Sequence, residues 1–421
     1  MKELFFIAIL FVFHTQSSLS QFEPNYEESK IPNFDLPDPL TTFDGKKISR
    51  KGQWKRTRRP ELYAFFEENV YGKIPAEFND FSAKVLEQGD NAINGKAKRR
   101  QVELSFEKNG RTLQFTMLIY LPKNVKKAPI FLGYNFLGNH TIAEDENIII
   151  SKAWARNSDK YGISGNKFTS ATRGIRTNRW AVEKILDAGF GLATIYYGEV
   201  DPDKDDFSDG IHPFLYNQGQ QKPDDNEWGS IAAWAWGYSR AMDYFEKSKE
   251  INSSKVVVFG HSRLGKTALW AGATDERFAA VISNDSGCGG AALSKRKVGE
   301  TVGRINDIFP YWFCTNFKAY NNNEEALPVD QHELLALIAP RPLYVASAKE
   351  DQWADPKGEF LSAYHASEVY GLFKKEGIPT DQMPMVNQPI QNTLAYHIRT
   401  GIHDVTDFDW EQYIKWAKQQ L

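Results

Sequence analysis

The sequence predicts an α/β fold built on a mostly parallel sheet with helices on both faces. Short runs of β-branched and aromatic residues recur at 115–121, 129–134, 192–197, 255–260, 279–284 and 342–347. Between the later runs, apolar residues repeat at helical spacing over 181–189, 230–248 and 358–377. Apolar strands that alternate with helices are typical of a sheet covered on both sides, so we expect a three-layer sandwich.

The composition is that of a globular protein. The chain has 421 residues, of which 41% are hydrophobic and 25% charged, with a formal net charge of -3. This balance offers no basic surface for nucleic acid. No long Gly/Ser linker, repeat or low-complexity tract divides the chain, so we expect a single domain over residues 21–421. Residues 21–60 are rich in proline and charge, which predicts an extended arm that wraps this domain.

The first twenty residues differ from the rest. Lys2 precedes an apolar run from Leu4 to Phe13, and small polar residues follow as far as Ser20. Such a run is too short to cross a bilayer but is typical of the core of a secretory signal, the alternative being a buried N-terminal strand. We therefore expect residues 1–20 to be a signal peptide, and the mature chain to be secreted or periplasmic and not bound to a membrane.

Few features suggest a metal, a cofactor or a disulfide. No Cys/His cluster with zinc-like spacing occurs, and no Gly-rich phosphate loop, so we expect neither metal nor cofactor. Two cysteines are present, Cys288 and Cys314. In an oxidising compartment they could pair, and two separate buried thiols fit nearly as well. We expect a monomer.

Ser262 is the first candidate for chemistry. It lies between the apolar strand 255–260 and a helix that starts with LGKTALW. A sharp strand-to-helix turn there lifts the hydroxyl above the sheet edge and places it beside free N–H groups that stabilise an anion. Gly260 and Gly265 supply the small residues that such a turn needs. The alternative is an N-cap serine, but the turn, the adjacent Arg263 and the downstream acids and histidine favour a nucleophile.

A serine nucleophile needs a base, and in this fold class the base comes late in the chain. His403, in RTGIHDVTDFDW, lies in a Gly-containing loop before a terminal amphipathic helix. We favour it over His397, which belongs to the more ordered segment LAYHIR. We expect the remaining histidines of the mature chain to be packed, structural or on the surface, among them His140, His261, His332 and His365.

Two acids compete to orient this histidine. Asp285 ends the strand at 279–284, and Asp351 follows the strand at 342–347. The carboxyl ends of parallel strands meet at one edge of a sheet, so both side chains could reach the imidazole. Taken singly, an aspartate after a strand is more often a cap or turn residue. The residues alone leave the choice open.

These residues carry a resemblance. GHSRLGK resembles the glycine, any, serine, arginine, any, glycine, lysine signature of the glucuronoyl esterases, carbohydrate esterase family 15. Longer segments resemble bacterial members of that family, and they include RRPELYAFFEENVYGKIP, SNDSGCGGAALSKRKVGETV, LPVDQHELLALIAPRPLYVASAKEDQWADPKGEF and YHIRTGIHDVTDFDW. The resemblance implies an α/β-hydrolase fold without a cofactor. It also implies cleavage of esters between the 6-carboxyl of (4-O-methyl)-glucuronic acid on xylan and lignin alcohols.

The resemblance also assigns roles to individual residues. It makes Ser262 the nucleophile, His403 the base, Arg263 a ligand of the oxyanion, Lys266 a contact of uronate hydroxyls, and Glu300 and Trp353 sugar-binding residues. Without it, each of the last three has a simpler interpretation: a solvated helix lysine, a surface charge and a packing tryptophan.

The resemblance bears on the acid as well. Fungal members carry a Glu where Asp285 stands, and many bacterial members rely on the acid that matches Asp351, so we favour Asp351. The disulfide that fungal members place beside the nucleophile and histidine cannot form here, because His261 and Asp404 occupy its positions.

Two other functions use the same features. An acetyl or feruloyl xylan esterase would keep the serine, histidine and acid, and a secreted carbohydrate-binding protein could carry an inactive hydrolase fold. We favour the glucuronoyl esterase over both, and we expect its substrate to be a glucuronoxylan or lignin–carbohydrate ester.

Overall fold

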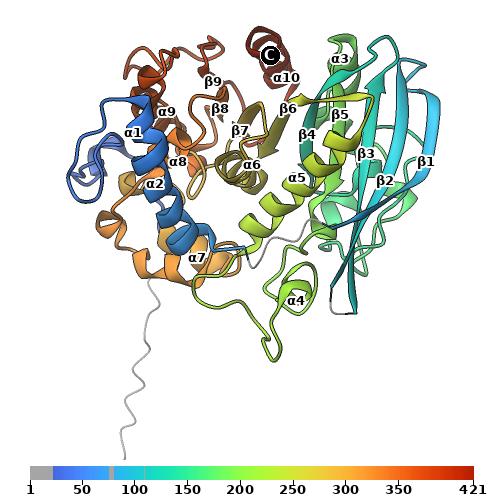
Figure 1. Cartoon of the computed structure of the whole chain (residues 1–421), viewed down its shortest axis with the longest axis horizontal. Helices are drawn as coiled ribbons and strands as arrows, with labels where there is room; N and C mark the ends of the chain where they lie inside the picture. Colours follow the sequence, from blue (N-terminus) through green and yellow to red (C-terminus); the bar gives the residue numbers. More distant parts are fainter. Residues whose placement is uncertain (1–21, 75–79, 109) are drawn as a thin grey trace, which may run out of the picture.

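The computed structural model describes residues 22–74, 80–108 and 110–421. The predicted signal peptide lies outside them. A nine-stranded sheet runs through the molecule in the order β1-β2-β3-β5-β4-β6-β7-β8-β9 (Figure 1). Its strands are β1 (Ser82–Ala92), β2 (Ala97–Lys108), β3 (Arg111–Pro122), β4 (Ala128–Asn135), β5 (Gly191–Tyr196), β6 (Ile251–His261), β7 (Ala280–Asn284), β8 (Leu343–Ala348) and β9 (Leu394–Arg399). Strands β4 to β9 pair in parallel, whereas β1, β2 and β3 pair antiparallel. The predicted fold class is confirmed.

Helices cover both faces of the sheet. One apolar core lies between the sheet and α2 (Arg59–Phe66), α5 (Ser230–Lys247), α6 (Arg263–Thr274), α8 (Gln331–Ala336) and α9 (Pro356–Leu372). The other core contains α3 (Val182–Asp187) and α10 (Asp407–Gln420). Strand β6 shows why its sequence is continuously apolar, because Val256 and Val258 face the first core and Val257 and Phe259 the second. Shorter helices are α1 (Lys51–Gln53), α4 (His212–Leu215) and α7 (Val302–Ile308).

Three strands were not predicted. In β2, buried and more exposed side chains alternate for much of its length, and the sequence AKRRQVELSFEK is charged on the open side. Strand β1 is mostly exposed, so it lacks an apolar run. Strand β9 lies in the segment LAYHIR, which we expected only to be more ordered than the loop of His403; all six of its residues are buried.

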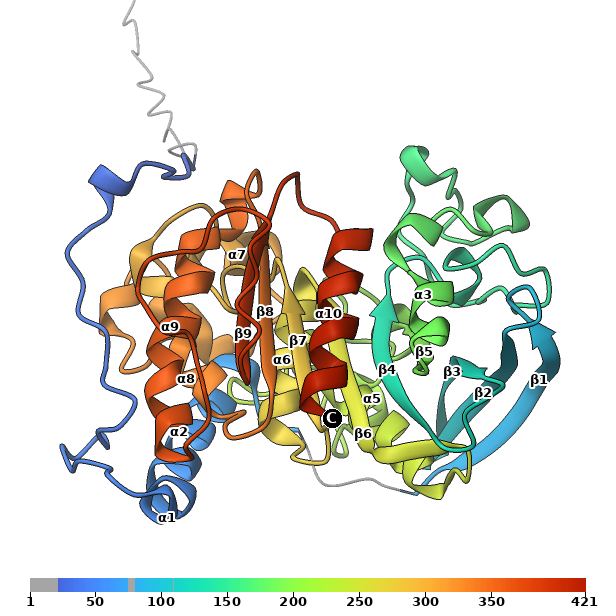
Figure 2. The same cartoon turned by 90° about the horizontal axis from the view of Figure 1, so that it is seen from above.

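The N-terminal segment follows the α9 side of the molecule. Residues 22–50 contain one short 3-10 helix, Glu28–Lys30, and run along the outside before reaching α1 (Figure 2). The first α-helix starts at Lys51, inside the range expected to be extended, and α2 has Pro60 in its first turn, where proline is tolerated.

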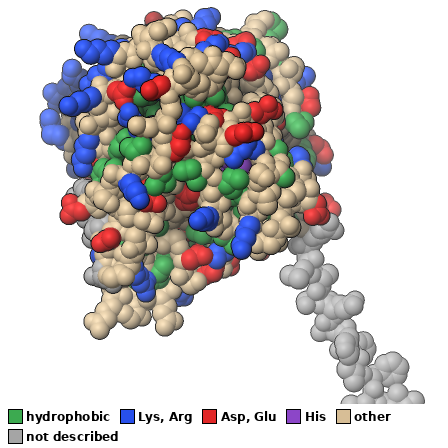
Figure 3. Space-filling model, turned by 90° about the vertical axis from the view of Figure 1, so that its right-hand side faces the viewer, with side chains coloured by type: hydrophobic (Ala, Val, Ile, Leu, Met, Phe, Trp, Pro, Cys, Tyr) green, Lys and Arg blue, Asp and Glu red, His purple; other side chains and the backbone are tan. Residues whose placement is uncertain are grey.

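The surface agrees with the mixed charge of the sequence. The face seen in Figure 3 carries lysine and arginine side chains as well as aspartate and glutamate side chains. No helix in the described part of the chain combines the length and apolar character needed to cross a membrane.

Candidate active site

Ser262 occupies a strained turn between β6 and α6. Its φ of 59° and ψ of -132° lie outside the regions that side chains normally allow. A Cβ at Gly260 would collide with the carbonyl oxygen of Leu264, and one at Gly265 would lie 3.0 Å from the Cβ of Ser286. The turn therefore requires Gly260, and Gly265 lets α6 pack closely against the segment that follows β7. Ser262 N donates to the carbonyl of Asn284 at the end of β7 (2.9 Å), which fixes the turn against the sheet.

Arg263 follows the serine and is held by a buried carboxylate. Its guanidinium is ion-paired with Asp203, which is 1% exposed, and lies over the ring of Trp312 at 4.7 Å. Burial alone would lower the pKa of Arg263, but the charge of Asp203 raises it above its ordinary value. The first turn of α6 thus carries a permanent positive charge beside Ser262.

Asp203 has a full set of donors. Its Oδ1 accepts hydrogen bonds from the Tyr311 hydroxyl (2.8 Å) and Trp312 Nε1 (2.9 Å), and its Oδ2 accepts one from the Tyr197 hydroxyl (2.9 Å). Burial opposes its charge, but Arg263 and these donors lower the pKa of Asp203 below its usual value. The ionised carboxylate therefore fixes the position of Arg263.

His403 contacts Asp351. The distance between His403 Nδ1 and Asp351 Oδ2 is 2.6 Å, and Asp351 is buried in the turn after β8. The imidazole side chain is 42% exposed and lines the same cavity as Ser262. A histidine in this position reaches both the serine cavity and solvent water, which acyl transfer requires.

Asp285 lies close by in a different environment. It is 2% exposed, Arg399 Nη2 donates to its Oδ2 at 3.3 Å, and its Oδ1 has no hydrogen-bond partner among the described residues. Burial, reinforced by the nearby charge of Glu359, raises the pKa of Asp285 well above its ordinary value. The carboxyl group hydrogen-bonded to the imidazole is that of Asp351.

Asp285, Asp351 and His403 also have the spacing of metal ligands. One ligand atom from each lies within 4.8 Å of the others, and among the described residues no second such group is found. The close approach has another explanation, since the His403 and Asp351 atoms are already hydrogen-bonded to each other.

Lys266 and Glu300 form a buried pair that faces the serine. Lys266 is 4% exposed, its Nζ donates to the Ser286 carbonyl (2.6 Å) and lies 3.6 Å from Glu300 Oε2. Burial raises the pKa of Glu300, and the charge of Lys266 opposes this. Glu300 N donates to the carbonyl of Trp353 at 3.0 Å, which links the pair to the partly exposed tryptophan. Neither a solvated helix lysine nor a surface charge describes these two residues.

One cavity brings together all eight residues singled out in the sequence. It has a volume of about 340 Å³, in the range of small-ligand pockets, and is lined by Ser262, Arg263, Lys266, Asp285, Ser286, Gly287, Glu300, Phe309, Trp312, Asp351, Trp353, Ala354 and His403. It lies where β6, β7 and β8 end. These residues meet because the loops that follow parallel strands all lie at the same edge of the sheet.

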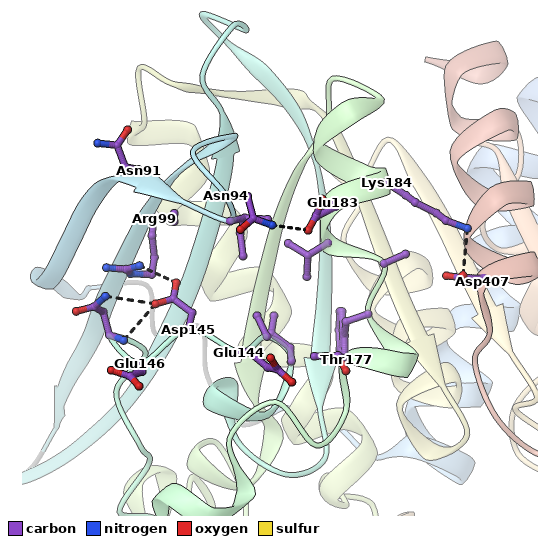
Figure 4. A pocket seen from close by; sticks show the side chains of 18 residues that line it. Asn91, Asn94, Arg99, Glu144, Asp145, Glu146, Thr177, Glu183, Lys184 and Asp407 are labelled. Atoms are coloured by element: carbon purple, nitrogen blue, oxygen red, sulfur yellow. Dashed lines mark hydrogen bonds and ion pairs between the residues drawn. The ribbon is translucent and has the colours of Figure 1, made fainter.

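A larger cavity of about 800 Å³ lies elsewhere, between the turn after β1, α3 and the start of α10 (Figure 4). Several of its polar side chains bind one another: Arg99 binds Asp145 (2.6 Å), Asn94 binds Glu183 (3.0 Å) and Lys184 binds Asp407 (3.2 Å). No serine, cysteine or histidine lines it. The smaller cavity therefore holds the candidate catalytic groups.

Other histidines are committed to structural contacts. His397 in β9 is buried between Asp409 (Nε2, 2.9 Å) and the Tyr344 hydroxyl (Nδ1, 2.9 Å). His261 is buried with Nδ1 2.8 Å from Asn284 Oδ1, and burial lowers its pKa well below the ordinary value. Its ring packs 4.5 Å from the His403 ring and remains neutral at physiological pH.

The positions of the fungal disulfide are filled by other contacts. Asp404, beside His403, is ion-paired with Arg179, and Arg176 Nη2 lies 3.5 Å from its Oδ1, so the segment 155–180 reaches the histidine loop. Cys288 and Cys314 are both buried and free. Of the two alternatives left open by the sequence, two separate thiols are observed.

Sequence reasoning missed two buried carboxyl groups at the site. Asp203 lies 60 residues before Arg263, in a loop whose acidic composition resembles any solvated turn. Glu359, in α9, accepts hydrogen bonds from Ser286 N (2.7 Å), Gly287 N (3.0 Å) and the Ser347 hydroxyl (2.6 Å). Only the folded arrangement shows that these acids hold active-site segments.

Known proteins similar to this chain are carbohydrate esterases. A family model described as glucuronyl esterase, fungi, matches residues 177–373. The chain is 48% identical over 401 residues to Carbohydrate esterase MZ0003 from an unknown prokaryotic organism, covering 94% of this chain and 92% of that one. A promiscuous CE15 esterase from a marine bacterial metagenome superposes with a TM-score of 0.89 and 47% identity, over 95% of this chain and 100% of that one. A glucuronoyl esterase from Solibacter usitatus gives 0.88 and 46%, over 93% and 99%.

Proposed function

Since the chain belongs to carbohydrate esterase family 15, the glucuronoyl esterases, and is a carboxylic ester hydrolase, we propose that it hydrolyses esters of (4-O-methyl)-glucuronic acid. Ser262, His403 and Asp351 form the catalytic triad of this proposal. Asp285 is a supporting acid, bound to Arg399 and with its pKa raised by burial.

The reaction is acyl transfer in two halves. His403 takes the proton of Ser262 as the serine oxygen bonds to the ester carbonyl carbon, and the resulting oxyanion is stabilised by the first amides of α6 and by Arg263. The carbon–alkoxy bond then breaks, and His403 protonates the leaving alcohol. In the second half His403 deprotonates a water that attacks the acyl-enzyme. The bond between the acyl carbon and the serine oxygen then breaks, and His403 returns the proton to Ser262 as glucuronate leaves.

The buried Lys266–Glu300 pair is the observation that carries the substrate assignment. A cation and a carboxyl group cost free energy when buried, and these two offset that cost by pairing with each other on the wall of the serine cavity, where both can also bind polar groups of a ligand. The hydroxyl groups of a uronate ring supply such partners, whereas an acetyl group does not. Trp353, which lines the same cavity, offers a flat apolar face for the C–H surface of the sugar.

The natural setting follows from the same proposal. We propose that the ester joins glucuronoxylan to lignin alcohols, and that the predicted signal peptide takes the enzyme to the periplasm or out of the cell. We also propose that residues 21–421 form one catalytic domain and that the enzyme acts as a monomer. The chemistry needs neither metal nor cofactor, because charge in the transition state is met by Arg263 and backbone amides.

The test uses benzyl glucuronate and an acetylated xylose with the wild type and Ser262→Ala. We expect the wild type to release glucuronate and Ser262→Ala to lose this activity. Release of acetate alone would replace the proposal with an acetyl esterase. Release of neither, together with sugar binding, would favour the non-catalytic carbohydrate-binding protein.

A further inference from the structure

Phe22, near the start of the described chain, packs against the sugar site. Its ring lies 6.2 Å from that of Trp353 in an edge-to-face arrangement of 81°. On the same ring, the Arg304 guanidinium lies 5.1 Å from the centroid. Arg304 belongs to α7, the helix that begins shortly after Glu300 in the sequence. Phe22 thus contacts Trp353 and the segment after Glu300 together.

Three residues further on, the arm bonds to the backbone next to Glu300. Gly299 N donates to the carbonyl of Asn25 at 2.9 Å. Gly299 has a φ of 61°, and a Cβ there would collide with the carbonyl oxygen of Trp353. Glu300 N donates to that same Trp353 carbonyl. Successive backbone hydrogen bonds therefore link the arm to the segment of Glu300, and that segment to Trp353.

Glu28 closes the connection from the other end. Its two oxygens bind Arg296 Nη2 (2.7 Å) and Lys357 Nζ (2.8 Å). Arg296 precedes Glu300 and also donates to Asp355 (2.8 Å), and Asp355 caps α9 just after Trp353. Glu28 therefore bridges the loop that carries Glu300 and the turn that carries Trp353.

We propose that residues 22–28 are a strap that positions Glu300 and Trp353 relative to each other and so sets the affinity for the uronate. The inference rests on the proposed function. The strap contacts described here reach the sugar-binding side of the cavity and none of them involves Ser262, Arg263 or His403. Its residues act through Trp353 and Glu300, and loosening it raises KM while leaving kcat in place.

The strap offers its own matched controls. Tyr26 is an aromatic residue of the same segment that is 48% exposed, so Tyr26→Ala controls for Phe22→Ala. Glu27 pairs with Lys30 on the surface, so Glu27→Gln controls for Glu28→Gln. Phe22→Tyr keeps the ring and should restore wild-type behaviour.

The experiment compares KM and kcat for benzyl glucuronate and for p-nitrophenyl acetate, which has no sugar. Phe22→Ala should raise KM for the glucuronate by about 3- to 10-fold, the value of one aromatic contact, with kcat within about 2-fold. Glu28→Gln should have a smaller effect, because its side chain is 53% exposed and its ion pairs are screened. Both controls, and all acetate kinetics, should match the wild type.

A double-mutant cycle separates positioning from general structure. In a Trp353→Ala background, Phe22→Ala should add little to the rise in KM. An unchanged KM in Phe22→Ala, or equal losses with both esters, would overturn the strap. If the wild type does not cleave the glucuronate, its affinity for free glucuronate measured by calorimetry takes the place of KM. Absence of that binding would reject the proposed function together with the strap.

Discussion

The carboxylate of Asp203 holds the Arg263 guanidinium beside Ser262, and the same carboxylate accepts hydrogen bonds from Tyr197, Tyr311 and Trp312. In the proposed mechanism, the charge that stabilises the oxyanion is therefore fixed before the substrate binds. Such preorganisation is the main source of electrostatic catalysis, because no reorientation is needed during the reaction.

Removing either member of this pair should reduce turnover. Arg263→Ala should lower kcat by about 100- to 1000-fold with little change in KM, the effect of losing one oxyanion donor. Asp203→Asn should lower kcat by about 10-fold, because the arginine remains but is no longer held by a charge. Steady-state kinetics on benzyl glucuronate measure both.

The cycle between the two variants decides whether Asp203 acts through Arg263. In an Arg263→Ala background, Asp203→Asn should cost little more. Asp205→Asn, at an exposed acid two residues away, is the control. A large rise in KM with normal kcat in Arg263→Ala would instead make the arginine a substrate clamp.

The two candidate acids should respond differently to amide substitution. Asp351→Asn should lower kcat by about 1000-fold or more, since the amide cannot stabilise the imidazolium that forms during the reaction. Asp285→Asn should cost less than about 10-fold, because Asp351 already orients the imidazole and the carboxyl group of Asp285 binds Arg399. Glucuronate release at pH 7 by the two purified variants tests this order, and a reversed order would make Asp285 the main orienting acid.

The buried pair should control KM. Glu300→Gln and Trp353→Ala should each raise KM for a glucuronate ester by about 10-fold and leave kcat/KM for p-nitrophenyl acetate near that of the wild type. Lys266→Gln should also lower the melting temperature, because it leaves Glu300 buried without its cation. A calorimetric scan beside the kinetics distinguishes the two effects. An equal loss of kcat/KM on both esters would show that these residues do not recognise the sugar.

Glu359 should make stability depend on pH. Burial raises its pKa to about 7, so the folded chain keeps a proton that the unfolded chain loses near pH 4.5. Its contribution is fully present below pH 4.5 and is lost as pH rises towards 7, a change of about 3 kcal/mol at most.

The matching variant is Glu359→Gln, which cannot titrate. Its melting temperature relative to that of the wild type should be higher at pH 8 than at pH 5. Denaturant unfolding at the two pH values gives the free energies. A difference between the two proteins that does not change with pH would show that Glu359 is charged throughout.

The sequence predicts those parts of the fold that depend on local patterns. The apolar strand before Ser262 and the glycines around it specify the turn, because each requirement lies within a few residues. Strands β1 and β2 escape prediction, since one side of each is open and polar. Their place is set by the pairing of β2 with β3 and of β1 with β2, which no local pattern records.

The site divides in the same way. Ser262, Asp351 and His403 each follow a strand. Their order along the chain is the order of nucleophile, acid and base that the fold class predicts. Asp203 and Glu359 are acids in ordinary surroundings along the chain, and their importance comes from partners 60 and 73 residues away. The choice between Asp285 and Asp351 depends on burial and hydrogen-bond geometry, which a single sequence does not contain.

The contacts around Asp203 also affect the order in which structure and activity return when the enzyme refolds. Its members come from the loop after β5, the start of α6 and the segment at Tyr311, which lies 108 residues from Asp203 in sequence. Contacts between distant segments form late, because the intervening chain must first be closed into loops. Secondary structure can thus return before Arg263 is locked, and the recovery of esterase turnover marks the docking of the last segment rather than the formation of the sheet.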